Sequence, residues 1–139
     1  MELVLQQPEY NKIIAHAEQG YPHEVVGILG GDRQNNRVQA VKMLINEKGN
    51  TTNRYKVGAL ALMRAEQELE RSGFEIVGYY HSHPDHPSQY SKHDLEQALP
   101  NMSYLIVSII NGQGDNLQSW RLTEDRSVMT EEKIILTPQ

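Results

Sequence analysis

The chain of 139 residues contains no cysteine. This absence excludes a disulfide framework, a zinc site built from thiolates and a cysteine nucleophile, and it fits a reducing compartment such as the cytoplasm. A long apolar run is also lacking, because YLIVSII at residues 104–110 is far too short to span a bilayer. The first residues show no charged segment followed by an apolar one, so we expect no signal peptide, no membrane association and a cytoplasmic location.

Basic clusters are scarce as well. The chain has 13 Lys and Arg against 18 Asp and Glu, for a net charge of −5. A nucleic-acid-binding surface needs clustered basic side chains, so we expect no nucleic-acid partner.

The length fits a single domain spanning residues 1–139. Its hydrophobic periodicity predicts an α/β (α+β) fold in which helices flank a mixed β-sheet. The predicted helices cover residues 8–20, 58–73 and 91–99; the predicted strands cover residues 24–31, 37–46, 53–57, 74–82, 103–110 and 116–125, with residues 131–136 as a last strand or a frayed end.

The most distinctive stretch is HSHPDHPSQYSKHD at residues 81–94, directly after a predicted strand. Alternate residues of a strand share a face, so His81 and His83 project together if the strand continues through them. Ser91 is a predicted helix N-cap, which places Asp94 in the first turn of that helix. Three nitrogen and oxygen ligands with one open position are typical of catalytic zinc, whose bound water has a pKa of about 7.

Each residue also has a simpler interpretation. Two histidines in an HxH pattern alone are a weak metal signal, and the same ligand types suit an iron site. Ser91 could simply cap a helix, and Asp94 could simply favour the helix dipole. His86 and His93 are better explained as surface residues or as neighbours of the ligands.

A hydrolase also needs a base, and Glu24 in PHEVVGILGG is the candidate. Its alternative is a solvated carboxylate at a strand end, which is the commoner fate of a glutamate. The position of Glu24 in the sequence does not by itself bring it near His81.

The joined pattern resembles the JAMM motif of MPN-domain metallopeptidases. In HSHP the second histidine, His83, is followed by seven residues, then Ser91, two more residues and Asp94, while PHEVVGILGG is similar to the upstream block that carries the motif glutamate. The resemblance implies a fold similar to that of cytidine deaminases. It also implies one Zn²⁺ per chain held by His81, His83 and Asp94, with water as the fourth ligand. Glu24 would then be the general acid and base, and Ser91 would help to hold the tetrahedral intermediate.

The chain is most similar to compact prokaryotic members of this family, in particular to sulfur-carrier-protein peptidases of the CysO-cysteine type. The resemblance implies hydrolysis of a peptide or isopeptide bond at the C-terminal glycine of a ubiquitin-like sulfur-carrier or modifier protein. We expect the substrate to present an extended tail that pairs with a sheet edge beside the metal.

Two alternative functions fit the sequence less well. One is a non-catalytic MPN-type interaction scaffold. The five intact motif positions argue against this function. The other is a small HxH oxygenase of the cupin kind, but cupins are nearly all β and the chain has a strong predicted helix at residues 58–73. The identity of the carrier protein and the formation of a homodimer stay open.

Overall fold

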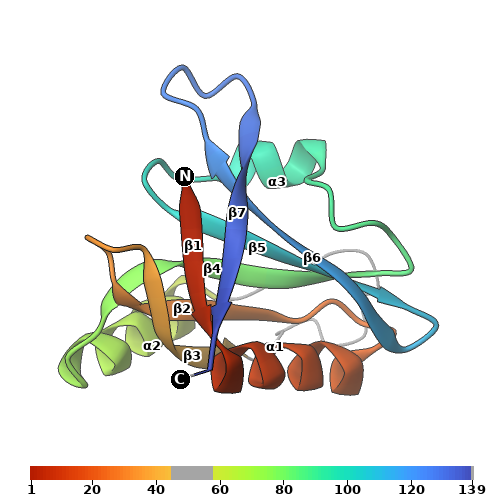
Figure 1. Ribbon diagram of the computed structural model, residues 1–139, viewed down its shortest axis with the longest axis horizontal. Coiled ribbons are helices and arrows are strands. Elements are labelled where there is room, and N and C mark those ends of the chain that lie inside the picture. The colour runs from red at the N-terminus through yellow and green to blue at the C-terminus, as the bar shows by residue number, and fades with distance from the viewer. Residues whose placement is uncertain (45–57, 139) are drawn as a thin grey trace.

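The computed structural model describes residues 1–44 and 58–138. Ten elements of secondary structure lie in these two stretches, and together they form a mixed sheet with helices on both of its faces (Figure 1). The helices are α1 (Gln7–Gly20), α2 (Ala59–Arg71) and α3 (Lys92–Gln97); the strands are β1 (Glu2–Gln6), β2 (Val26–Asp32), β3 (Arg37–Leu44), β4 (Glu75–Pro84), β5 (Ser103–Ile110), β6 (Gln113–Leu122) and β7 (Met129–Thr137).

The sheet closes on itself in the order β1-β3-β2-β4-β5-β6-β7, because β1 pairs with both β3 and β7. The pairs β1–β3, β1–β7 and β4–β5 are parallel, and the other neighbours are antiparallel. Figure 1 shows β1 and β7 side by side in front of the strands that run across the molecule.

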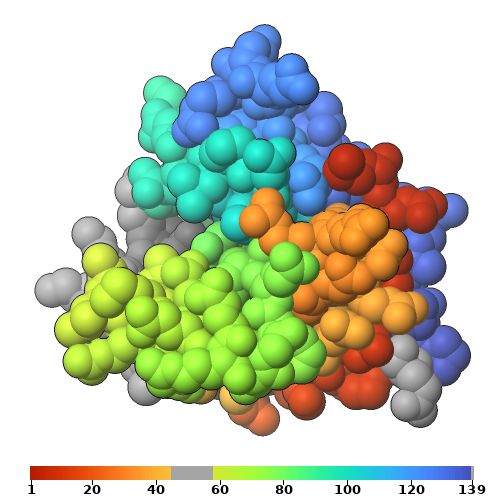
Figure 2. Space-filling model, turned by 90° about the vertical axis from the view of Figure 1, so that its left-hand side faces the viewer, coloured from red at the N-terminus to blue at the C-terminus, as the bar shows by residue number. Residues whose placement is uncertain are grey.

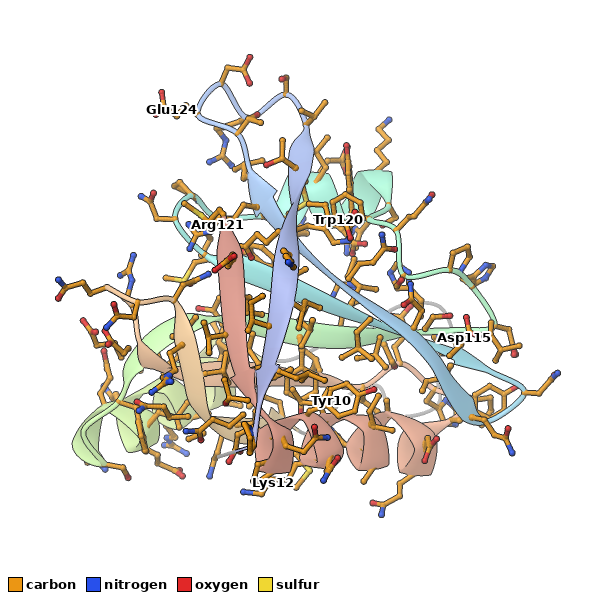
Figure 3. All side chains as sticks on the ribbon, viewed as in Figure 1. Tyr10, Lys12, Asp115, Trp120, Arg121 and Glu124 are labelled. Carbon is orange, nitrogen blue, oxygen red and sulfur yellow. The ribbon has the colours of Figure 1, made fainter. Side chains whose placement is uncertain are left out.

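The two faces of the sheet bury two hydrophobic clusters. Leu3 and Leu5 alternate along β1 and are fully buried in the larger cluster, to which α1 contributes Ile13 and Ala17. Figure 3 shows Tyr10 on the side of α1 that faces the sheet and Lys12 on the opposite side.

The smaller cluster lies under α2, which buries Ala65 and Leu69 against Ile28 and Ile76. Figure 2 shows α2, in yellow-green, lying across the lower part of this face of the molecule. The helices that the structure describes are too short or too polar to serve as membrane spans.

Gly27 in β2 permits a close approach that positions the strand carrying the histidines. A Cβ atom at Gly27 would lie 2.1 Å from the ring of Tyr80, the residue directly before His81. Because a side chain there would collide with a fully buried ring, only glycine lets β2 and β4 pair closely at this point.

The predicted helices and the predicted mixed sheet are confirmed, with ends that shift by a few residues. The strand β1 was not predicted, and neither was closure of the sheet; the tail predicted as a strand or a frayed end is the strand β7. The predicted strand 53–57 lies outside the described residues. The register of β4 with β2 ends at His81, whereas its register with β5 continues to Pro84, so pairing of a substrate tail beside the end of β4 stays a prediction.

Candidate metal centre

His81 and His83 are brought together by the end of β4. The strand continues to Pro84, so both imidazoles project from the same face, with ring centroids 5.0 Å apart. Their Nε2 atoms are 3.2 Å from each other. The predicted pairing of the two side chains is therefore present in the structure.

Asp94 reaches these imidazoles from the first turn of α3. Ser91 is the N-cap, and a capping box fixes the turn: the Asp94 amide donates to Ser91 Oγ at 3.1 Å, and the Ser91 amide donates to Asp94 Oδ2 at 2.8 Å. Asp94 Oδ1 lies 3.0 Å from His81 Nε2, and Asp94 Oδ2 lies 3.2 Å from His83 Nε2. The capping box therefore aims one carboxylate at both imidazoles.

The charges in this cluster depend on one another. Burial acts to raise the pKa of Asp94, but hydrogen bonds to His81 and His83 outweigh it and hold that pKa well below its ordinary value. Burial acts to lower the pKa of His83, but Asp94, the Pro87 carbonyl and the negative charge of Glu24 together hold that pKa above its ordinary value. The site thus favours a carboxylate that faces a positive charge.

The donor set fits a metal ion. His83 Nδ1 lies 2.8 Å from the Pro87 carbonyl oxygen, which can only accept, so Nδ1 carries the proton and Nε2 of the neutral ring has a free lone pair. That lone pair faces a carboxylate, and a cation between them removes the repulsion. Two nitrogens about 2.0–2.1 Å from one tetrahedral zinc ion would be about 3.3–3.4 Å apart, close to the separation that the two imidazoles already have.

His81, His83 and Asp94 form a group whose ligand atoms all lie within 4.8 Å of one another, and no other such group occurs among residues 1–44 and 58–138. His86 and His93 are not members of it. His86 is exposed and lines the adjoining cavity, while His93 is half-buried on α3.

Glu24 and Ser91 line one cavity with His83. Its volume is about 410 Å³, and its remaining wall comes from Pro84 at the end of β4 and from the loop that follows: His86, Pro87, Gln89 and Tyr90. Glu24 is half-buried and acts on His83 through its charge, as the raised pKa of His83 reflects. The structure therefore brings the Glu24 carboxylate, the Ser91 hydroxyl and the His83 imidazole to the same cavity.

The segment that carries Glu24 is held by Ser82, a residue for which the sequence interpretation gave no role. The Val25 amide donates to Ser82 Oγ at 2.9 Å, and the Ser82 amide donates to the Val25 carbonyl at 3.0 Å. Ser82, which lies between the two histidines in the sequence, is fully buried. A residue between His81 and His83 on a strand points to the opposite face, and a buried serine there needs hydrogen-bond partners; this was the signal that could have revealed it.

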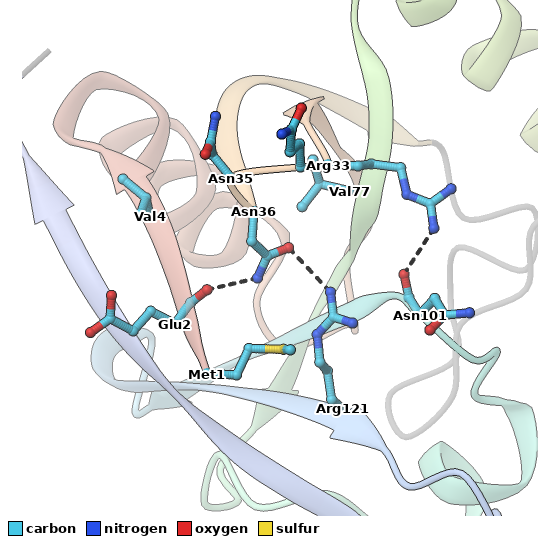
Figure 4. A pocket seen from close by; sticks show the side chains of 10 residues that line it. Met1, Glu2, Val4, Arg33, Asn35, Asn36, Val77, Asn101 and Arg121 are labelled. Atoms are coloured by element: carbon cyan, nitrogen blue, oxygen red, sulfur yellow. Dashed lines mark hydrogen bonds between the residues drawn. The ribbon is translucent and has the colours of Figure 1, made fainter.

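A larger cavity, of about 680 Å³, lies elsewhere, beside the N-terminus and the β2–β3 turn. Figure 4 shows its polar lining, in which Asn36 Nδ2 donates to the Glu2 carbonyl and Arg121 donates to Asn36 Oδ1 at 3.2 Å. Arg121 Nε also donates to the buried Glu132 at 2.7 Å. The lining of the larger cavity includes none of the grouped residues His81, His83 and Asp94, so the smaller cavity is the candidate site.

Comparison with known proteins decides the family. A family model described as prokaryotic homologs of the JAB domain matches residues 6–123. The chain belongs to this family. A JAB1/MPN domain protein from Archaeoglobus fulgidus superposes with a TM-score of 0.58 at 14% identity over 96% of each chain, and this likeness confirms the predicted MPN fold. A solution structure of a protein from Desulfitobacterium hafniense is more similar, with a TM-score of 0.84 and 29% identity over 100% of this chain and 94% of that one.

Three proteins to which the chain is similar carry functional names. The chain is 32% identical over 114 residues to a probable TtuB-protein conjugate cleaving protease of Thermus thermophilus, covering 82% of this chain and 72% of that protein. It is 32% identical over 103 residues to a desampylase of Haloferax volcanii, covering 70% and 74%. It is 25% identical over 138 residues to a CysO-cysteine peptidase of Mycobacterium tuberculosis, covering 99% and 92%. The predicted relation to sulfur-carrier peptidases is confirmed.

Proposed function

We propose that the chain is a zinc metallopeptidase that hydrolyses a peptide or isopeptide bond at the C-terminal glycine of a ubiquitin-like sulfur-carrier or modifier protein. The observation that carries this proposal is the convergence of His81, His83 and Asp94 beside a cavity that Glu24 also lines. The names of the relatives support the substrate class, since they describe two cleavers of protein conjugates or modifiers and a CysO-cysteine peptidase.

In this mechanism His81, His83 and Asp94 would hold one zinc ion. When bound, zinc polarises a scissile carbonyl and lowers the pKa of a water molecule. Glu24 accepts the proton of that water and later delivers it to the leaving amine. The Ser91 hydroxyl donates a hydrogen bond to the oxygen on which negative charge develops.

The neighbouring groups suit these roles. The hydrogen bond between the Val25 amide and Ser82 Oγ fixes the backbone next to Glu24, so its carboxylate needs little rearrangement to act as a base. The Ser91 amide is occupied by Asp94, and Ser91 Oγ accepts from the Asp94 amide, so its hydroxyl proton is available to a substrate.

The test combines metal analysis with cleavage. Protein purified without added metal should carry one zinc per chain and should release the group joined to the C-terminal glycine of a carrier protein. Removal of zinc with a chelator should abolish cleavage, and zinc added back should restore it. Full cleavage by protein shown to be free of zinc would refute the proposal, as would zinc-loaded protein that cleaves no member of a panel of carrier and modifier conjugates.

A further inference from the structure

The loop after β4 rests on one face of β6. Asn116, Gln118 and Trp120 alternate along this strand and point to the same side, and we call these three residues the β6 platform. All three hydrogen-bond to Ser88: Ser88 Oγ donates to Gln118 Oε1 at 2.7 Å, Asn116 Nδ2 donates to Ser88 Oγ at 3.0 Å, and Trp120 Nε1 donates to the Ser88 carbonyl at 3.0 Å. Trp120 is labelled in Figure 3.

Ser88 differs from its neighbours in the loop. Its exposed fraction is 2%, whereas His86, Pro87 and Gln89 are exposed. Tyr90 adds an edge-to-face contact with the Trp120 ring at 5.0 Å between centroids. A short polar side chain is therefore buried with both its donor and its acceptor capacity used, in a loop that is otherwise at the surface.

The other end of the loop is fixed to β5. Ser108 Oγ donates to the His86 carbonyl at 2.7 Å, and the Asp85 amide donates to the Ile109 carbonyl at 2.6 Å. Pro87 lies between His86, which is anchored to β5, and Ser88, which is anchored to β6. Its carbonyl accepts the hydrogen bond from His83 Nδ1, so the anchors on β5 and β6 together set the position of that oxygen.

We propose that Ser88 and Trp120 are positioning residues for His83, through the Pro87 carbonyl. This inference rests on the proposed zinc function. The carbonyl holds the Nδ1–H tautomer and the ring orientation that direct the Nε2 lone pair of His83 toward Asp94. When the platform releases Ser88, the carbonyl moves, and the imidazole can rotate or shift its proton to Nε2, where the proton blocks a metal ion. Partners that orient a metal-binding histidine in this way typically contribute 10–100-fold to metal affinity.

A purely structural role would have a different signature, and β6 supplies the matched control. Ser119 lies between Gln118 and Trp120 but points to the other face, where its fully buried hydroxyl donates to Glu132 at 2.7 Å. Ser88→Ala and Ser119→Ala therefore each remove a buried serine hydroxyl and its hydrogen bonds, at sites joined by the same strand. Both should lower the melting temperature, but only Ser88→Ala should weaken zinc binding.

The experiment measures the zinc dissociation constant by competition with a chromophoric chelator, together with the visible spectrum of the cobalt-substituted protein. Trp120→Phe keeps an aromatic ring beside Tyr90 but removes the Nε1–H donor together with part of the ring system. Trp120→Phe and Ser88→Ala should each bind zinc about 10–100-fold more weakly than the parent, with an altered cobalt spectrum, and Ser88→Thr should recover most of the affinity. Affinities that match that of Ser119→Ala would overturn the proposal.

The outcomes also separate this proposal from the proposed function. If the parent binds no zinc, both fail. If His83→Ala abolishes zinc binding while Ser88→Ala and Trp120→Phe do not change it, only the positioning role fails. If Trp120→Phe does not fold, Gln118→Leu is the replacement, because it removes a different bond to Ser88 from a half-buried position, and zinc affinity equal to that of the parent would refute the role.

Discussion

Replacing Glu24 by glutamine tests the proposed chemistry most directly. Glutamine has the shape of glutamate but cannot accept the proton of a water molecule. Glu24 is outside the group formed by His81, His83 and Asp94, so Glu24→Gln should retain zinc, fold and substrate binding. Loss of a general base typically lowers the rate about 10²–10⁴-fold. At about 1.36 kcal/mol per tenfold, this is about 2.7–5.4 kcal/mol of transition-state stabilisation.

The assay is single-turnover cleavage of a carrier-protein conjugate, with zinc measured on the same sample. Glu96→Gln is the matched control, because it removes the same charge from an exposed position on α3, two residues after Asp94. This control distinguishes loss of a specific proton acceptor from a general change in the electrostatic field around the site. The Glu96→Gln variant should cleave the conjugate at the rate of the parent.

Two results would refute the reasoning for Glu24. A cleavage rate within a few-fold of the parent would mean that Glu24 is a carboxylate two residues before β2 without a catalytic role. Loss of zinc together with activity would mean that Glu24 completes the metal shell, and the base would then have to be another group in the cavity.

Three further predictions address the metal, the substrate and the pH dependence. His83→Ala should lose most bound zinc and lower the melting temperature, because metal binding no longer favours the folded state; zinc content equal to that of the parent would exclude His83 as a ligand. Carrier proteins whose last two glycines are replaced by alanine should be cleaved much more slowly, since glycine lets the backbone approach the metal closely; equal rates would argue against a narrow path to the site. Burial lowers the pKa of His16 from 6.5, so the unfolded chain binds this proton more readily and the parent should lose stability as the pH falls below about 6.5. His16→Gln should show a smaller loss in urea unfolding between pH 7.5 and 5, and identical pH slopes would contradict the burial of a neutral His16.

The sequence predicts those parts of the fold whose signal is local. The alternation through His81 and His83 and the capping residue Ser91 each depend on a few neighbouring residues, so the strand, the helix and the grouping of their side chains could be predicted together. β1 was missed because its five residues are stabilised by pairing with β3 and β7, which come from distant parts of the chain. Closure of the sheet is a property of those pairings and has no local pattern.

The residues that we propose to position His83 could not be predicted from the sequence, for a related reason. The β6 platform faces Ser88 only because β5 and β6 pair in one register, with Ser108 opposite Asn116 and an irregularity directly after Ser108. A shift of one residue would turn Trp120 to the other face and replace it with Ser119. HSHP therefore contains the two grouped histidines, whereas the residues that we propose to orient His83 depend on a hairpin about 30 residues after Ser88.

Ser91 and Asp94 show why the simpler and the chemical interpretations of this motif do not exclude each other. The capping box that begins α3 uses Asp94 Oδ2 and the Ser91 hydroxyl oxygen, and the same geometry directs the carboxylate at both imidazoles. An N-cap serine typically contributes about 1 kcal/mol to stability, so the helix start alone would hold Asp94 in place before any metal arrives. The spacing of two residues between Ser91 and Asp94 is what a capping box requires, and it is also the spacing of the JAMM motif. A motif of this kind thus combines the folding signal of a helix with the preorganisation of a metal ligand.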